Sequence, residues 1–426
     1  MKERSFWSDT ITVPAAAPAP LPARVDVVVI GAGITGLCAA RSLARRGIRV
    51  AVLETHTIGW GASSRNGGMV LTGHKLGAAT LLSRYGRELA RQLYKASIDS
   101  VDLVAAIVQA EGIDCDFQRS GHLALAAKRG HYAYYLHEAE LLAREFSHEI
   151  RLVPRAELRA EIGSDAYFGG VVDPVSGGIN PARYVAGLAT AARRGGATLH
   201  EQTCVERIAR HGARWQVRAT GGVVDAGDVV VATSGYTGAV SPTLQRKLLP
   251  IGSYVIATEP LSEALARELS PRGRMFYDSW HFLHYFRLTP DRRLLFGGRA
   301  RFVPESEAAV RESAAELRKG MLAIYPQLHA VGIDYAWGGT LDFSYDTMPH
   351  LGLTDGYHYA LGYAGHGVAL ASQLGTELGE RLGTAALQES PFAQLPFAPV
   401  PLGLHRHKHG FLRLAALWYR LLDLIS

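Results

Sequence analysis

The sequence predicts an α/β protein in which two domains are interleaved along one chain. The chain has 426 residues, more than a single small core usually needs. Residues 25–54 read as a strand, a glycine-rich turn, a helix and a second strand, the order of a parallel β-α-β unit. Between residues 251 and 298 the pattern becomes alternating and rich in aromatic residues, which predicts antiparallel strands in a separate layer.

The β-α-β unit is complete within about 30 residues. Val25–Ile30 is a β-branched run typical of a strand buried on both faces, and Arg49–Leu53 is a second strand that closes on Glu54. Between them, residues 37–46 have apolar residues at helical spacing, and Gly47 ends that helix.

The turn of this unit has the sequence Gly31-Ala32-Gly33-Ile34-Thr35-Gly36. The first glycine allows a tight turn, the second lets backbone N–H groups approach a pyrophosphate, and Gly36 permits close packing of helix and strand. The N-terminus of a helix favours an anion, and Glu54 is placed to accept hydrogen bonds from ribose hydroxyls. The sequence therefore predicts a Rossmann-like dinucleotide site.

The remaining elements follow from periodicity and from turn residues. We expect helices over residues 89–108, 136–146, 181–194, 303–321 and 367–382. We expect strands near residues 198–208, 215–219, 225–233, 282–288 and 294–296.

These elements suggest a division into domains. Residues 24–88, 175–250 and 335–390 are assigned to the nucleotide domain, and residues 89–174 and 251–334 to a discontinuous α+β substrate domain. Residues 1–23 are an Ala- and Pro-rich stretch without the apolar core of a signal peptide, and are expected to be an extended leader. Residues 391–426 form a C-terminal extension with an amphipathic helix over 411–425, for which docking on the protein's own surface is favoured over membrane association.

Composition excludes several classes of function. The net charge of +6 comes from arginines scattered among acids, without the dense basic run of a nucleic-acid-binding protein. Three distant cysteines predict neither disulfides nor a zinc site, and we expect no metal. No stretch approaches the roughly 18 consecutive apolar residues of a membrane span, so a cytoplasmic location is expected.

The segment after the second strand favours FAD over NAD. Residues 58–69 (IGWGASSRNGGM) follow almost directly, where a nicotinamide dehydrogenase normally continues with further βα units. Small residues and glycines let backbone lie against a flat ring system, and Arg65 and Asn66 add hydrogen-bond donors. A flexible surface loop is the alternative interpretation of this segment alone.

With these motifs, the sequence resembles the D-amino-acid oxidase-like superfamily of FAD-dependent oxidoreductases, and within it the gamma-glutamylputrescine oxidoreductase branch. Further matching segments run in order over roughly residues 5–382. They are Ser5-Phe6-Trp7, residues 177–181 (GGINP), 201–208 (EQTCVERI), 230–238 (VVATSGYTG), 251–260 (IGSYVIATEP), 286–298 (FRLTPDRRLLFGG), 337–339 (WGG) and 363–368 (YAGHGV).

The resemblance implies a set of FAD-binding residues. The set is Gly31, Gly33, Ile34, Thr35, Gly36 and Glu54 for the ADP half, Val205 at the adenine, and Ser63, Arg65, Asn66, Gly67, Gly68, Thr233, Gly235, Gly339, Gly365, His366, Gly367 and Val368 elsewhere. Some relatives attach the flavin through a cysteine, but residues 337–346 contain none, so we expect non-covalent FAD. A helix that begins at Gly367 points its positive end at the ligand, which favours charge at flavin N1.

The expected reaction is oxidation of the C–N bond of a small amine. A neutral amine delivers hydride to flavin N5, the imine is hydrolysed to a carbonyl compound, and oxygen or another acceptor takes the electrons. His366, Tyr254 and Arg287 are the catalytic candidates, His366 to polarise flavin or shape the pocket and Arg287 to bind a substrate carboxylate. Tyr254 and Tyr285 could each form an aromatic wall of a pocket for an alkylamine. His281 and His284 would face opposite sides of a regular strand, so at most one of them can face a ligand.

Two other functions remain open at this point. A sarcosine-, glycine- or D-amino-acid-type oxidase or dehydrogenase differs in substrate, and Arg287 separates it from an amine oxidase. A flavin-binding electron-transfer subunit without its own substrate is a different class of protein.

Overall fold

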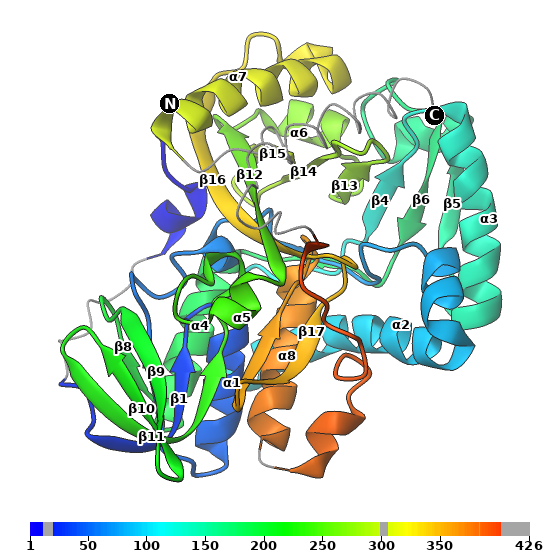
Figure 1. The fold of residues 1–426 in the computed structure, drawn as a ribbon. Helices are drawn as coiled ribbons and strands as arrows, with labels where there is room; N and C mark the ends of the chain where they lie inside the picture. Colours follow the sequence, from blue (N-terminus) through cyan, green and yellow to red (C-terminus); the bar gives the residue numbers. More distant parts are fainter. Residues whose placement is uncertain (12–19, 299–305, 383, 402–426) are drawn as a thin grey trace.

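The computed structural model describes residues 1–11, 20–298, 306–382 and 384–401. It contains two large sheets that lie in separate regions of the molecule (Figure 1). Their strands come from interleaved parts of the chain, so an α/β fold with a second, antiparallel sheet is confirmed.

The first sheet is mostly parallel and contains the β-α-β unit. Its central path, in spatial order, is β17 (His350–Thr354), β18 (Tyr357–Leu361), β11 (Gly222–Val231), β1 (Arg24–Ile30), β2 (Val50–Leu53) and β8 (Thr198–His200). The pairs β1–β11, β1–β2, β2–β8 and β11–β18 are parallel. β9 (Val205–His211) and β10 (Arg214–Ala219) extend β11 as an antiparallel meander.

Three helices pack together beside this sheet. They are α1 (Ile34–Arg45), α4 (Pro181–Arg194) and α8 (Gly367–Arg381), with α1 lying against both of the others (Figure 1). Gly375 and Gly379 let α8 approach α1 closely, because a Cβ on either would meet backbone oxygens of α1. This packing brings the N-termini of α1 and α8 to one cavity.

The second sheet is antiparallel except where β13 pairs with β4. Its spatial order is β16 (Ile333–Ser344), β12 (Leu248–Thr258), β15 (Leu294–Gly298), β14 (His284–Leu288), β13 (Met275–Asp278), β4 (His122–Leu125), β6 (Gly169–Asp173) and β5 (Arg151–Pro154). One face packs with α6 (Glu263–Leu269) and α7 (Glu307–Ile324) around stacked Phe276, Phe286 and Phe296.

The other elements connect the two sheets. These are α2 (Ala78–Glu111), α3 (Arg129–Phe146), α5 (Pro242–Gln245), the short pair β3 (Met69–Val70) and β7 (Gly177–Gly178), and the 3-10 turns Phe6–Thr10, Ala62–Ser64, Arg155–Ala160, Ser234–Tyr236, Pro326–Leu328 and Ala385–Glu389. α2 crosses the domain boundary predicted at residues 88 and 89, and β16 pairs with β12 although residues 335–344 were assigned to the nucleotide domain. The division into domains stays a prediction.

Several predicted elements differ from the structure in extent. α4 matches its predicted range, whereas α2 begins well before residue 89 and continues through a kink at Gly86, whose φ is +74°. α3 also begins earlier than predicted, at Arg129. The single strand expected over 198–208 is two strands, because Gln202 turns the chain with a φ of +53°.

The N-terminal residues are not simply an extended leader. Phe6–Thr10 is a 3-10 turn, and Phe6 and Trp7 are buried against Tyr335 and Trp337. Two aromatic side chains close together supply enough apolar area to fix this short segment on the protein. The amphipathic helix predicted over 411–425 lies outside the described residues.

Across residues 1–11, 20–298, 306–382 and 384–401, no helix combines the length and apolar character that crossing a bilayer requires.

Candidate functional site

The turn after β1 has the tight geometry that its glycines predict. Gly31 has a φ of +101°, and a Cβ on Gly36 would overlap the carbonyl oxygen of Gly31. Glu54, at the end of β2, accepts hydrogen bonds from the N–H groups of Ala32 (2.8 Å) and His56 (2.9 Å). The carboxylate is therefore fixed beside the start of α1.

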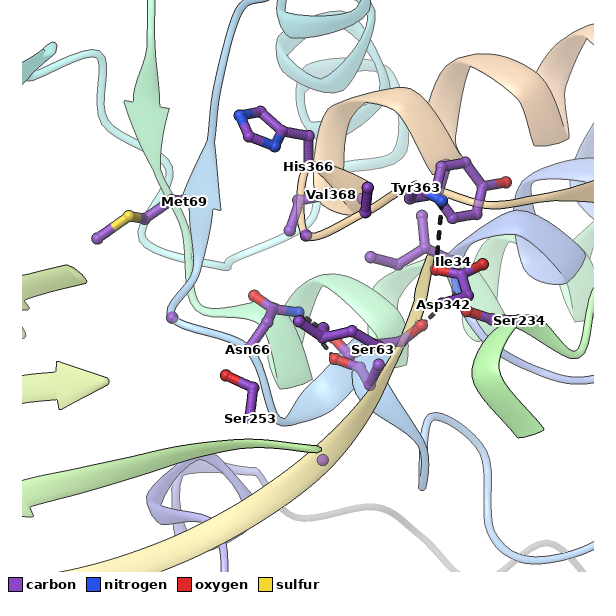
Figure 2. Close-up of a pocket in the computed structure, with 18 of the residues that line it drawn as sticks. Ile34, Ser63, Asn66, Met69, Ser234, Ser253, Asp342, Tyr363, His366 and Val368 are labelled. Carbon is purple, nitrogen blue, oxygen red and sulfur yellow. Dashed lines mark hydrogen bonds between the residues drawn. The ribbon is translucent and has the colours of Figure 1, made fainter. Parts of the chain in front are cut away.

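A cavity of about 300 Å³ extends from this turn toward the second sheet (Figure 2). We call it the cofactor cavity. The predicted residues that line it are Gly33, Ile34, Thr35, Ser63, Arg65, Asn66, Gly67, Gly339, Gly365, His366, Gly367 and Val368. The structure thus brings together segments that the sequence analysis selected separately.

The loop over residues 62–68 is held rigidly along one side of the cavity. The Asn66 amide donates to the carbonyl oxygens of Ala62 and Ser63 (both 3.0 Å), and its Oδ1 accepts from Gly68 N–H (2.8 Å). The indole N–H of Trp7 donates to Asn66 O and that of Trp337 to Arg65 O, both at 2.8 Å. These bonds exclude the interpretation of the segment as a flexible surface loop.

The other predicted FAD-binding residues do not line the cavity. Some of them shape the turn or hold the loop beside it, and the rest lie farther away. Gly31, Gly36 and Glu54 shape the turn, and Gly68 accepts a hydrogen bond from Arg287. Thr233 bonds Thr237 and Gly235 packs on Leu341, while their neighbours Ala232 and Ser234 line the cavity instead. Val205 is buried in the first sheet, close to Thr203, whose N–H donates to Glu54 O (2.7 Å).

Two catalytic candidates are not at the cavity. Tyr254 lies in the apolar core between the second sheet and α7, since strand alternation turns the neighbouring Ser253 to the cavity. The buried guanidinium of Arg287 donates to the carbonyl oxygens of Gly68 (2.7 Å) and Ile179 (3.1 Å). Burial lowers the pKa of Arg287 to about 10. The structure gives it a role in holding backbone, not in contacting a substrate carboxylate.

His366 lies at the junction of α8 with the preceding loop. Figure 2 shows its ring directed away from Ser63 and Asn66. Burial, with the positive charge of Lys75 as a further cause, lowers the pKa of His366 to about 3. The imidazole is therefore neutral at physiological pH.

A second cavity, of about 770 Å³, adjoins the first. We call it the outer chamber. The two cavities share a wall made by His74, Lys75, Tyr277, Leu283, Phe343 and His366. His281 lines the outer chamber, whereas His284 bonds the buried Asp278 (2.9 Å). Tyr285 lines the cofactor cavity.

The comparisons with known proteins agree with this geometry. The DAO family of FAD dependent oxidoreductases matches residues 26–381. The chain belongs to this family. FAD is its cofactor, and the chain is an FAD-dependent oxidoreductase.

Relatives cover nearly the whole chain. It is 34% identical over 400 residues to gamma-glutamylputrescine oxidoreductase of Escherichia coli, covering 93% of this chain and 92% of that protein. It is also 34% identical over 363 residues to the probable oxidoreductase OrdL of Haemophilus influenzae, covering 84% and 82%. Glycine oxidase from Geobacillus kaustophilus shares the fold, with a TM-score of 0.74, 22% identity and coverage of 89% of this chain and 99% of that one.

The residues present fit FAD. Gly33, Gly67, Gly339, Gly365 and Gly367 line the cavity, so backbone is open to a flat ring at several edges. The cavity meets the N-terminal ends of both α1 and α8, which suit a pyrophosphate and a ring edge that gains charge. When bound, FAD supplies the acceptor for a hydride.

Asp342 is a cavity residue that the sequence analysis did not select. Its buried carboxylate accepts from the N–H groups of Gly362 (2.6 Å) and Tyr363 (3.2 Å), which ties β16 to the loop before α8 (Figure 2). Burial raises the pKa of Asp342 to about 6. The sequence signal that could have identified Asp342 is its position between two apolar residues, Leu341 and Phe343.

In the part of the chain that the structure describes, no group of three or more His, Cys, Asp or Glu side chains is arranged to hold a metal ion.

Proposed function

We propose that this enzyme oxidises the C–N bond of a small amine and yields an imine that water hydrolyses to a carbonyl compound. The observation that carries the proposal is the outer chamber, which adjoins the cofactor cavity through a common wall and gives a substrate space beside the flavin site. Similarity to gamma-glutamylputrescine oxidoreductase supports an amine as the substrate.

The residues of the common wall suit a neutral amine. Hydride loss from the α-carbon requires a free nitrogen lone pair, so the bound amine must be unprotonated. The charge of Lys75 and the burial that lowers the pKa of His74 and of His366 disfavour a positively charged ammonium group at this wall. Leu283, Phe343 and Tyr277 add apolar surface to the same wall, which helps to keep water from the reacting carbon.

Anaerobic mixing of the holoenzyme with a panel of amines tests the proposal. At least one alkylamine is expected to bleach the flavin band near ~450 nm. Faster bleaching by glycine, sarcosine or D-amino acids favours the amino-acid oxidase alternative, which similarity to glycine oxidases supports. Absence of bleaching by the whole panel favours an electron-transfer subunit. Following oxygen uptake against reduction of an artificial dye then identifies the electron acceptor.

We further propose that FAD is bound non-covalently and that the enzyme works in the cytoplasm. Cys38, Cys115 and Cys204 are free, and none of them lines the cofactor cavity. Free thiols suit a reducing compartment. Acid precipitation should leave the yellow colour in the supernatant, whereas colour that stays with the pellet contradicts non-covalent binding.

A further inference from the structure

The outer chamber has a basic residue in the wall that it shares with the cofactor cavity and acidic residues elsewhere in its lining. The wall shared with the cofactor cavity contains the cation Lys75, whereas Glu138, Asp173 and Asp278 line the outer chamber and are not part of the cofactor cavity. The volume of about 770 Å³ exceeds what a small amino acid needs, so a longer substrate fits beside the flavin site.

Two of these three carboxylates already have charged or titratable partners. Asp173 accepts from Thr72 and pairs with His148 at 2.9 Å, and both residues of that pair are buried. Asp278 pairs with His284, also at 2.9 Å. Asp173 and Asp278 therefore already interact with histidines of the protein itself.

Glu138 is different. Its Oε1 accepts from Ala78 N–H at 2.8 Å, and its Oε2 accepts from the Tyr134 hydroxyl at 3.0 Å. Both donors are neutral, and no Lys, Arg or His among the described residues forms an ion pair with it. A carboxylate oxygen has further lone pairs, so Glu138 can still accept from a cationic donor.

The aromatic wall around Glu138 suits an ammonium group. Its charge contributes to raising the pKa of Tyr134, Tyr94 and Tyr277, which places three phenol rings within its field. Trp280 also lines the outer chamber, and aromatic rings such as these attract cations.

We propose that Glu138 binds a second, cationic group of the substrate inside the outer chamber. The enzyme then selects linear substrates with two nitrogen ends, of which the unprotonated amine lies at the Lys75 wall and the distal ammonium lies at Glu138. The inference rests on the proposed amine oxidation and narrows its substrate class to diamine-type compounds.

The test compares matched ligands on the holoenzyme. Linear diamines of three to eight carbons are set against monoamines and ω-amino acids of the same lengths, with dissociation constants from calorimetry on the oxidised enzyme and rate constants from anaerobic flavin reduction. We expect the best diamine to bind roughly tenfold more tightly than its monoamine, the factor for one partly shielded charge pair. Added salt should reduce this preference.

Variants of α3 identify the residue responsible. Glu138→Gln keeps an acceptor for Ala78 N–H but removes the charge, and it should abolish the diamine preference. Glu140→Gln, an exposed change on the same helix that lines neither cavity, should keep the preference.

The outcomes separate the two proposals. Equal affinity for diamines and monoamines, a preference for ω-amino acids, or a preference that persists in Glu138→Gln overturns the inference. Diamine binding without any flavin reduction keeps the inference about Glu138 and overturns amine oxidation instead. If Glu138→Gln does not fold, the salt dependence of diamine binding to the wild-type enzyme decides.

Discussion

The cofactor cavity and the outer chamber adjoin, yet they are built from different chemistry. Five glycines and the N-termini of α1 and α8 contribute to the lining of the cofactor cavity, so its shape depends in part on the path of the backbone. The outer chamber is lined by tyrosines, histidines and carboxylates from α2, α3, β4, β6, β13 and the loops between them. Backbone therefore contributes more to the shape of the cofactor cavity, whereas side chains determine the chemistry of the chamber that we assign to the substrate.

The strongest test of this contrast is Gly36→Ala. A Cβ at this position overlaps the carbonyl oxygen of Gly31 and lies 3.2 Å from Val29 Cγ1, so α1 must move away from β1. We expect loss of FAD from the purified protein and a fall of about 4 kcal/mol in the free energy of unfolding. Flavin absorbance per chain and urea unfolding measure both.

Gly130→Ala is the matched control, because nothing lies within 4 Å of a Cβ at that helical position. It should leave FAD content unchanged. If Gly36→Ala also retains FAD, the cofactor cavity does not depend on this backbone contact.

Asp342 sharpens the comparison, since it is a titratable side chain within the backbone-lined cavity. Its pKa is about 6 in the folded protein, above the ordinary value of 3.8 for an aspartate, so the folded state holds the proton more tightly than the unfolded chain does. The resulting stability is full below about pH 4 and is lost as pH rises through 6, a change of about 3 kcal/mol.

Asp342→Asn should remove this part of the pH dependence. Urea unfolding of the FAD-free protein between about pH 4 and about pH 7 measures it, with the wild-type profile as reference. Identical pH profiles for the two proteins contradict the assignment to Asp342.

Arg287→Met tests whether a buried side chain outside both cavity walls controls the cofactor loop. The substitution leaves the carbonyl oxygens of Gly68 and Ile179 without this donor, which should cost about 2–3 kcal/mol of unfolding free energy and weaken FAD binding. The relative affinities for carboxylate-bearing and plain amines should not change. A selective loss of carboxylate-bearing substrates contradicts this account, and Arg218→Met on exposed β10 controls for loss of charge.

Tyr254→Phe should have the smallest effect. The ring lies in the apolar core, so flavin reduction by the best amine should stay within about twofold of wild type. Ser253→Ala, on the opposite face of the same strand, removes a hydroxyl from the cavity wall and should shift the flavin absorption spectrum. The reverse pattern means that the faces of β12 are assigned wrongly.

The same contrast explains what the sequence could predict. Gly31, Gly33 and Gly36 act within one short turn, so their spacing and the flanking strands were sufficient to predict the dinucleotide site. Family resemblance then selected the loops at Arg65–Gly67 and Gly365–Val368, which the structure brings to one cavity.

Long-range placement could not be predicted in the same way. Glu138 and Lys75 reach the cavities through contacts between distant segments, which no local pattern encodes, and the only local signal for Asp342 was an acidic residue between apolar neighbours. Arg287 has the residue type of a carboxylate ligand, but the register of β14 directs it at Gly68 and Ile179. Strand alternation likewise places Ser253, which the sequence analysis did not select, at the cofactor cavity and places Tyr254 in the apolar core.

The two indoles that hold the cofactor loop have a consequence for biosynthesis. Trp337 and the start of α8 follow Trp7 by more than 300 residues, so they are synthesised well after it. A nascent chain has the pyrophosphate turn early but lacks the opposite wall until late in translation. The complete cofactor cavity can therefore form only after synthesis has passed the start of α8.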